Sequence, residues 1–292
     1  MPEWPPIDEP ELLERLGLDD AGFGEYLRAL AERLPARPYE PELLARALEY
    51  PWARPPGSYL LSGEGAELLA AMEPERHERT VAEYSGAASG RLPLLAIGSN
   101  AAPAVLARKF AHFGAAADRA LLALSGRLHE FDVGAAAQPA LYGALPATLF
   151  PSPGTAVAAT LLWVTPAQFT QLTWSELSYR LGRLRTRFAA DEGGGDFGAV
   201  LVFVSRFGSL CLDGEPVAMA AVPASGRSAP ALTQEQLLDA VAARALGPGA
   251  DAEALVRAVH EDLGGLVPRL AATVHGEAQR FESERWAPFR RE

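Results

Sequence analysis

The amino-acid sequence predicts an α+β fold in which a strand-rich centre is preceded and followed by helices. Apolar residues recur at helical intervals near both ends of the chain, whereas the centre consists of short apolar runs separated by turn residues. The 292 residues, 49% of them hydrophobic and 22% charged, supply a sizeable core. We divide the chain into a helical N-terminal extension (residues 1–90), a central domain (91–230) and a C-terminal helical segment packed on it (231–292).

In the N-terminal extension, the apolar spacing predicts two amphipathic helices within residues 9–37. Prolines interrupt the pattern that follows, and shorter helices fit residues 41–49 and 74–84. Residues 86–90 are small and form a linker, so we place the start of the central domain directly after them.

The central domain opens with an apolar strand at 92–97, the turn Gly98-Ser99-Asn100 and a helix that begins near Ala102. Further strands are expected at 121–131, 147–150 and 157–164, with residues 151–154 as a turn between the last two. A helix follows at 166–174. After a glycine-rich loop at 191–198, residues 199–204 and 209–212 predict a strand pair, and residues 217–222 continue the β character.

The C-terminal segment carries helix-start signals. Thr233 and Gln236 form a capping-box pattern that opens a helix to about residue 246. Asp251 caps a second helix, to about residue 263, and a third is expected over residues 266–281.

Composition limits the classes of partner. The net charge of −11 and the pI near 5.1 argue against nucleic acid, because its binding needs clustered cations. The single cysteine, Cys211, cannot form an internal disulfide, and the first residues lack the pattern of a secretory signal. No apolar run approaches the roughly 20 residues that cross a bilayer. We expect a cytoplasmic protein without a membrane segment; the oligomeric state stays open.

The turn after the first central strand is the sharpest local feature. Gly98 allows a tight turn, and the amides of Ser99, Asn100 and Ala101 can converge near the positive end of the next helix. Such amides can bind a carboxylate or phosphate, although the same turn also occurs for geometric reasons alone. Lys109, the only lysine among 26 basic residues, lies in that helix.

Several segments together resemble the γ-glutamylcyclotransferase-like family, whose members open with a strand ending in Y-G-S-N and place a catalytic glutamate after a later helix. The matching segments are residues 94–100 (LLAIGSN), 126–132 (GRLHEFD), 146–154 (PATLFPSPG), 157–164 and 166–176 (PAQFTQLTWSE). The resemblance implies a small mixed β-barrel with helical extensions. It also implies a substrate site formed by Ile97, Gly98, Ser99, Asn100, Ala101 and Tyr179, with Glu176 as the catalytic residue.

Two positions depart from the family pattern. Ile97 stands where the family has tyrosine, and residues 172–177 (LTWSEL) replace the usual L-D-x-x-E-G. These departures leave a second hypothesis open, in which the chain is a non-catalytic small-molecule-binding or scaffolding protein on the same fold. Glu176 would then only occupy a helix end, as many glutamates do.

The chemistry implied by the resemblance is release of 5-oxoproline from a γ-glutamyl amine or peptide. The substrate's own α-amine attacks its γ-carbonyl, so proximity is supplied within one molecule and we expect neither a metal nor a cofactor. One carboxylate can take the proton of the α-ammonium group and return it to the leaving amine. We assign this role to Glu176, with the Gly98-to-Ala101 amides holding the α-carboxylate. The five histidines show no zinc-binding spacing.

Overall fold

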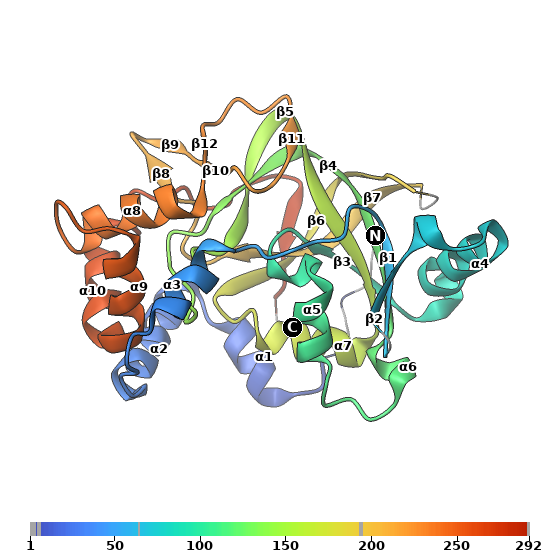
Figure 1. The fold of residues 1–292 in the computed structure, drawn as a ribbon, viewed down its shortest axis with the longest axis horizontal. Helices are drawn as coiled ribbons and strands as arrows, with labels where there is room; N and C mark the ends of the chain where they lie inside the picture. Colours follow the sequence, from blue (N-terminus) through green and yellow to red (C-terminus); the bar gives the residue numbers. More distant parts are fainter. Residues whose placement is uncertain (1–3, 5–6, 64, 193–194, 291–292) are drawn as a thin grey trace.

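A closed five-stranded β-barrel forms the centre of the computed structural model, which describes residues 4, 7–63, 65–192 and 195–290 (Figure 1). Its strands are β3 (Leu92–Ala96), β4 (Leu121–Ala135), β5 (Ala147–Val164), β6 (Tyr179–Ala190) and β7 (Asp196–Ser205). They pair in the order β5-β3-β7-β6-β4, and β4 closes the ring on β5. The β3–β7 pair is parallel and the other pairs are antiparallel. The predicted α+β class and mixed barrel are confirmed.

Both terminal segments add strands to this sheet. The prediction that these segments are purely helical is therefore wrong. In the N-terminal part, β1 (Tyr59–Ser62) pairs with β4 and with β2 (Gly65–Leu68). Near the C-terminus, β13 (Trp286–Pro288) pairs with β6. These strands have three or four residues, too few for a periodic apolar pattern to reveal them.

Several strand predictions in the centre are wrong. The segment 147–164 is one strand, because the Pro-Ser-Pro-Gly sequence continues β5 past an irregularity in its pairing with β4 instead of reversing the chain. Strand β6 falls on an arginine-rich run, where no strand was predicted. The segment 209–212 contributes only β8 (Cys211–Leu212), which pairs with β9 (Glu215–Pro216) and not with β7.

Short strands complete the sheet at its margin. Of the predicted β region 217–222, only β10 (Ala218–Met219) is a strand, and it pairs with β4 and with β12 (Ala231–Leu232). Strand β11 (Ala224–Ser225) pairs with β5.

One group of helices lies together on one side of the barrel. In this group, α2 (Asp20–Arg33) packs on α10 (Leu263–Thr273), and α3 (Pro41–Leu48) packs on α8 (Gln234–Ala245) and α9 (Ala252–Glu261) (Figure 1). The others are α1 (Pro10–Gly17), α4 (Pro74–Ser85), α5 (Pro103–Lys109), α6 (Ala116–Arg119) and α7 (Pro166–Trp174). The expected caps at Thr233 and Asp251 are present. The last helix ends at Thr273, eight residues before the predicted end at Phe281.

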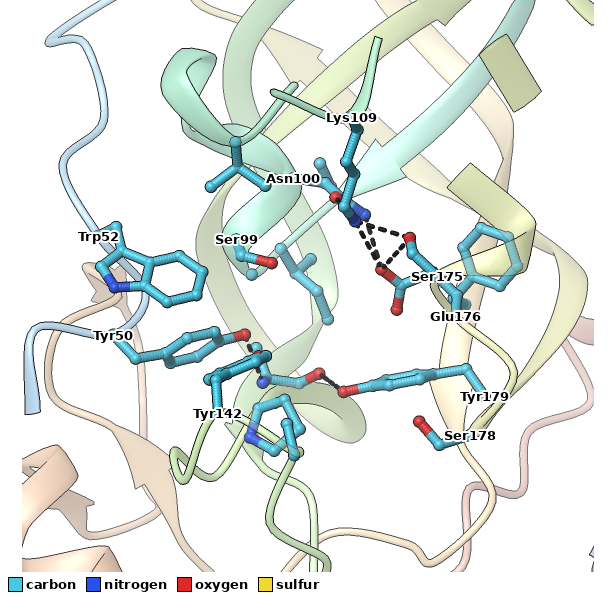
Figure 2. Close-up of a pocket in the computed structure, with 18 of the residues that line it drawn as sticks. Tyr50, Trp52, Ser99, Asn100, Lys109, Tyr142, Ser175, Glu176, Ser178 and Tyr179 are labelled. Carbon is cyan, nitrogen blue, oxygen red and sulfur yellow. Dashed lines mark hydrogen bonds and ion pairs between the residues drawn. The ribbon is translucent and has the colours of Figure 1, made fainter. Parts of the chain in front are cut away.

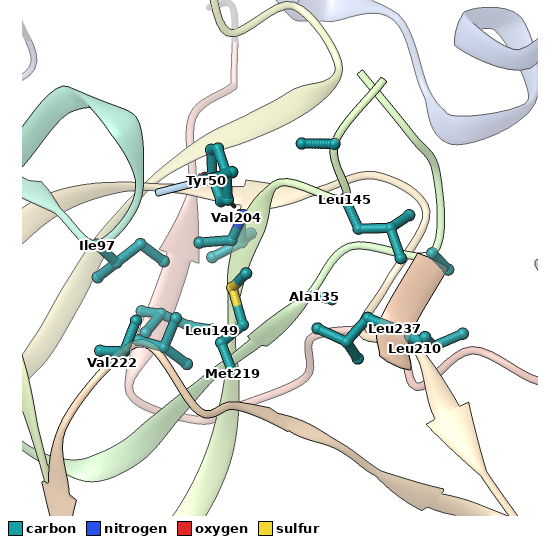
Figure 3. Close-up of a cluster of buried hydrophobic side chains, with 14 of the residues drawn as sticks. Tyr50, Ile97, Ala135, Leu145, Leu149, Val204, Leu210, Met219, Val222 and Leu237 are labelled. Carbon is teal, nitrogen blue, oxygen red and sulfur yellow. Dashed lines mark hydrogen bonds between the residues drawn. The ribbon is translucent and has the colours of Figure 1, made fainter. Parts of the chain in front are cut away.

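The main hydrophobic core joins the barrel to its extensions. Leu149 of β5, Met219 of β10 and Leu237 of α8 are at most 1% exposed and belong to one cluster (Figure 3). Tyr50, from the turn after α3, and Ile97 belong to the same cluster. Because burying one such side chain contributes about 2 kcal/mol, the shared core holds the N-terminal segment against the barrel.

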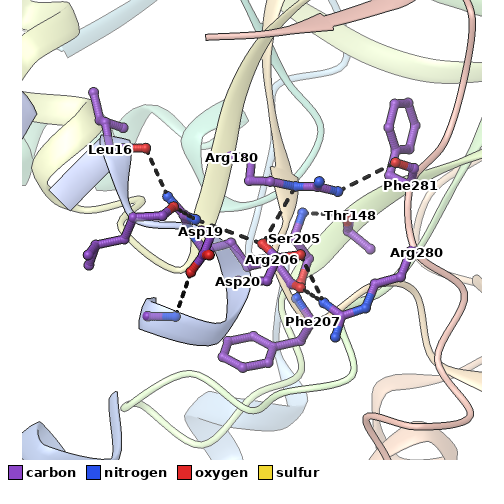
Figure 4. A network of polar contacts seen from close by, with 12 residues as sticks. Leu16, Asp19, Asp20, Thr148, Arg180, Ser205, Arg206, Phe207, Arg280 and Phe281 are labelled. Atoms are coloured by element: carbon purple, nitrogen blue, oxygen red, sulfur yellow. Dashed lines mark hydrogen bonds and ion pairs between the residues drawn. The ribbon is translucent and has the colours of Figure 1, made fainter. Parts of the chain in front are cut away.

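A buried arginine fixes a second contact between the N-terminal helices and the barrel (Figure 4). Arg206, directly after β7, has a side chain that is 2% exposed. Its guanidinium donates to the carbonyl of Leu18 at 2.6 Å and to that of Leu16 at 3.3 Å, at the C-terminal end of α1, and lies 3.8 Å from Asp20. Its Nε donates to the carbonyl of Leu177 at 3.2 Å. Helix α1 is thereby tied to the segment that follows α7.

Candidate functional site

The turn after β3 is a single 3₁₀ turn, Ser99–Ala101, and α5 begins at Pro103, close to the predicted start. The amide of Ala101 donates to the carbonyl of Gly98 at 3.1 Å, so it closes the turn and does not face a ligand. The amide of Asn100 has no hydrogen-bond acceptor among the residues that the structure describes. Of the predicted amides, that of Asn100 is therefore available to a ligand and that of Ala101 is not.

Gly98 is required where it stands because a Cβ there would collide with the hydroxyl of Tyr50 and lie 3.2 Å from the Cβ of Ala147. On the outer side of the turn, Arg54 donates to the carbonyls of Ile97 at 2.7 Å and Gly98 at 3.2 Å. Tyr50 and Arg54 of the N-terminal segment therefore both contact this turn.

Glu176 is presented by the end of α7. Thr165 and Gln168 form a capping box that starts this helix, which begins at Pro166 as predicted. The helix ends at Trp174, and the amide of Glu176 donates to the carbonyl of Thr173 at 3.0 Å. Glu176 therefore stands two residues beyond α7, in a turn that points its carboxylate toward the turn after β3.

The two segments meet through a polar cluster of four side chains: Asn100, Lys109, Ser175 and Glu176 (Figure 2). Asn100 Nδ2 donates to Glu176 Oε1 at 3.0 Å. Lys109 Nζ donates to Asn100 Oδ1 and to Ser175 Oγ, each at 2.7 Å, and lies 3.5 Å from Glu176 Oε1. All of these contacts to Glu176 involve Oε1.

The carboxylate of Glu176 is therefore held by one oxygen. Its side chain is 14% exposed and that of Lys109 is 16% exposed, so their ion pair is largely shielded from solvent. Within the described residues, Glu176 Oε2 has no hydrogen-bond partner. This oxygen is left for a bound molecule.

A cavity of about 280 Å³ adjoins the polar cluster, which is large enough for an amino-acid-sized ligand. It brings together six of the seven residues predicted for the site: Ile97, Gly98, Ser99, Asn100, Glu176 and Tyr179. Ala101 is 1% exposed and does not line it. We find no group of three or more His, Cys, Asp or Glu side chains arranged for a metal ion in the described part of the chain.

Two tyrosines fix the floor of this cavity at the start of β5. Ala147 donates its amide to the hydroxyl of Tyr50 at 2.8 Å, and Tyr179 donates its hydroxyl to the Ala147 carbonyl at 2.9 Å. Burial raises the pKa of Tyr50 to about 12 and that of Tyr179 well above its ordinary value. Both hydroxyls stay protonated near neutral pH. A tyrosine hydroxyl thus lies beside the turn although position 97 is isoleucine.

The residues of the cavity and the polar cluster that were not predicted from the sequence include Tyr50, Trp52, Lys109, Tyr142 and Ser175. Lys109 carried a signal, because it is the only lysine in the chain and lies nine residues after Asn100. The three aromatic residues lie outside the segments that resemble the family, and nothing in their local sequence marked them.

In comparisons with known proteins, a solved structure described as "Gamma-glutamyl cyclotransferase" is similar to this chain, with 16% sequence identity and a TM-score of 0.30. The similarity covers 39% of this chain and 66% of that one. No family model matches the chain, and no curated protein matches it. No helix in the described residues is long and apolar enough to span a membrane.

Proposed function

We propose that this protein is a cofactor-free γ-glutamyl cyclotransferase-like enzyme that releases 5-oxoproline from a γ-glutamyl amine or peptide. The observation that carries the proposal is the carboxylate of Glu176, with Oε1 anchored by Asn100 and Oε2 unpartnered among the described residues, at the wall of a cavity of about 280 Å³. The Asn100 amide and the Ser99 hydroxyl adjoin the same cavity and suit the substrate's α-carboxylate.

In the proposed reaction, Glu176 Oε2 takes one proton from the α-ammonium group of the substrate. The amine nitrogen then bonds to the γ-carbonyl carbon, and the bond from that carbon to the leaving nitrogen breaks as Glu176 returns the proton to it. The attacking nitrogen loses a second proton when the lactam forms, and the released amine takes it up. Glu176 ends the cycle as a carboxylate, so no external reactant is needed.

Lys109 positions this carboxylate in the proposed mechanism. Its three ammonium protons face Asn100, Ser175 and Glu176, so none remains for the substrate. The short contact to Ser175 also resembles a serine–lysine pair for nucleophilic catalysis. We do not favour that mechanism, because Lys109 pairs with a carboxylate and the Ser175 hydroxyl donates to the Leu172 carbonyl at 2.7 Å.

The test is to incubate the purified protein with γ-glutamyl amides and γ-glutamyl dipeptides and to quantify 5-oxoproline by mass spectrometry. We expect turnover by the wild-type chain, none by Glu176→Gln, and wild-type rates for Glu78→Gln, a change on the exposed face of α4. Undiminished turnover by Glu176→Gln would remove this residue from the mechanism.

A non-catalytic small-molecule-binding role is the second candidate. The observation that favours it is the Lys109–Glu176 ion pair, which occupies one oxygen of the acid. This role predicts no 5-oxoproline from any compound, together with calorimetric binding of a γ-glutamyl amide that Glu176→Gln retains.

A further inference from the structure

We propose that the amine released by this enzyme carries an uncharged apolar or aromatic substituent, and that this substituent packs on an aromatic wall made of Tyr50, Trp52 and Tyr142. This inference rests on the proposed function and names its substrate class. All three residues line the cavity that holds Glu176, and Figure 2 shows Tyr50 and Trp52 across it from Lys109 and Glu176. A substrate that places its α-amine at Glu176 then extends the substituent of its leaving amine toward the aromatic wall.

The wall is continuous. The ring centroids of Trp52 and Tyr142 are 5.2 Å apart, those of Tyr50 and Trp52 are 5.4 Å apart, and those of Tyr50 and Tyr142 are 6.1 Å apart. These separations are those of rings in direct contact. The rings are therefore packed against one another and are not spread around a central space, as the rings of an aromatic cage are.

The charges around the cavity also disfavour a leaving amine whose far end carries a second, cationic group. Among the described residues, the charged side chains that line it are Arg108, Lys109 and Glu176. Lys109 already compensates Glu176, which leaves the positive charge of Arg108. The guanidinium carbon of Arg46 lies 5.7 Å from the centre of the Trp52 ring, so a cation already occupies part of that aromatic surface.

The wall is preorganised by the backbone around it. The Trp52 indole donates from Nε1 to the carbonyl of Arg46 at 3.2 Å. Trp52 itself has a left-handed backbone with φ of 65°, which is uncommon for a large side chain and frequent at binding sites. Tyr50 is 3% exposed and hydrogen-bonded to Ala147. A ligand that packs on these rings does not have to order them first.

A matched pair of substrates tests the inference: γ-glutamyl-pentylamide and γ-glutamyl-putrescine, which have chains of similar length that end in a methyl group or an ammonium group. We expect kcat/KM to be at least about tenfold higher for the pentylamide. Tyr142→Leu should reduce this ratio by about threefold or more. Tyr39→Leu, a tyrosine outside the cavity, should leave the ratio unchanged.

The same pair is compared by calorimetry with Glu176→Gln, so that the preference is measured without turnover. Tighter binding of the pentylamide supports the aromatic wall, whether or not any compound yields 5-oxoproline. Absence of 5-oxoproline from every compound would overturn only the proposed function. Equal affinity for the two compounds, or a preference for γ-glutamyl-putrescine, would overturn the inference and leave the proposed function standing if 5-oxoproline forms.

Discussion

The side-chain amide of Asn100 spans the site and donates from Nδ2 to Oε1 of Glu176 at 3.0 Å, across 76 positions of sequence. Lys109 fixes the direction of this amide, because an ammonium group can only donate and therefore faces Oδ1. The orientation of Asn100 thus follows from its two charged neighbours. A substitution at any of the three should disturb the other two.

Replacing Lys109 tests this arrangement. Lys109→Met keeps much of the side-chain volume but removes the donors to Asn100, Ser175 and Glu176. We expect kcat to fall by roughly 10- to 100-fold with a smaller change in KM, because the carboxylate is misplaced while the cavity persists. Steady-state kinetics measure kcat and KM of this variant, and Arg28→Met, a change at an exposed position on α2, is the control. A change in KM alone would instead assign Lys109 to substrate binding.

Gly98 and Tyr50 should show strong coupling. A Cβ at position 98 collides with the Tyr50 hydroxyl, so Gly98→Ala should destabilise the wild-type protein by about 1–3 kcal/mol. Tyr50→Phe removes that oxygen and leaves the buried Ala147 amide without its acceptor, at a cost of about 1–3 kcal/mol.

The double variant should therefore be more stable than the sum of the two losses predicts, because the hydroxyl that obstructs the Cβ is gone. Urea unfolding of the four proteins gives the interaction free energy. Additive losses would mean that the Tyr50 ring, and not its hydroxyl, requires glycine at this position.

Loss of Arg206 should affect stability and turnover together. Arg206→Met leaves carbonyls at the end of α1 and the carbonyl of Leu177 without this donor. Because several buried acceptors lose one partner, we expect a destabilisation on the order of 3 kcal/mol, measured by thermal or urea unfolding. Leu177 adjoins Glu176, so kcat should fall even at temperatures where the variant is fully folded. Unchanged kcat would show that this contact serves stability alone.

The stability of the fold should fall as the pH drops below about 6.5, partly through His275. Burial against Phe207 lowers the pKa of His275 from 6.5 to about 4, and the ring hydrogen-bonds to Gln138. Between these two values the unfolded chain binds a proton that the folded chain excludes, so protonation favours unfolding. Urea midpoints at pH 7.5 and 5.0 should differ less for His275→Gln than for the wild type. An equal difference would exclude His275 as a source of this pH dependence.

The sequence was most informative where local rules decide the structure. The caps at Thr233 and Asp251 were predicted from side chains that bond to amides within the next turn. The resemblance to the γ-glutamylcyclotransferase-like family predicted Gly98, Asn100 and Glu176 as site residues. All three line one cavity, and their roles stay predictions.

Predictions from the sequence failed where pairing between distant segments determines which residues form a strand. Residues 151–154 contain the composition of a turn, yet they continue β5, whose residues on both sides of this stretch pair with the long strand β4. The arginine-rich strand β6 alternates buried Leu184, Thr186 and Phe188 with exposed or half-buried arginines, a pattern that the charges obscured. The contribution of Tyr50 to the site depends on how the N-terminal segment crosses the barrel, which no local pattern encodes.

The way Tyr50 and Arg54 reach into the barrel has a practical consequence for engineering. A fragment that begins at the 86–90 linker would contain every segment that resembles the γ-glutamylcyclotransferase-like family and still lack one side of the cavity. Transplanting this pocket to a smaller scaffold, or trimming the chain for expression, therefore requires that residues 46–54 travel with the strands they cross.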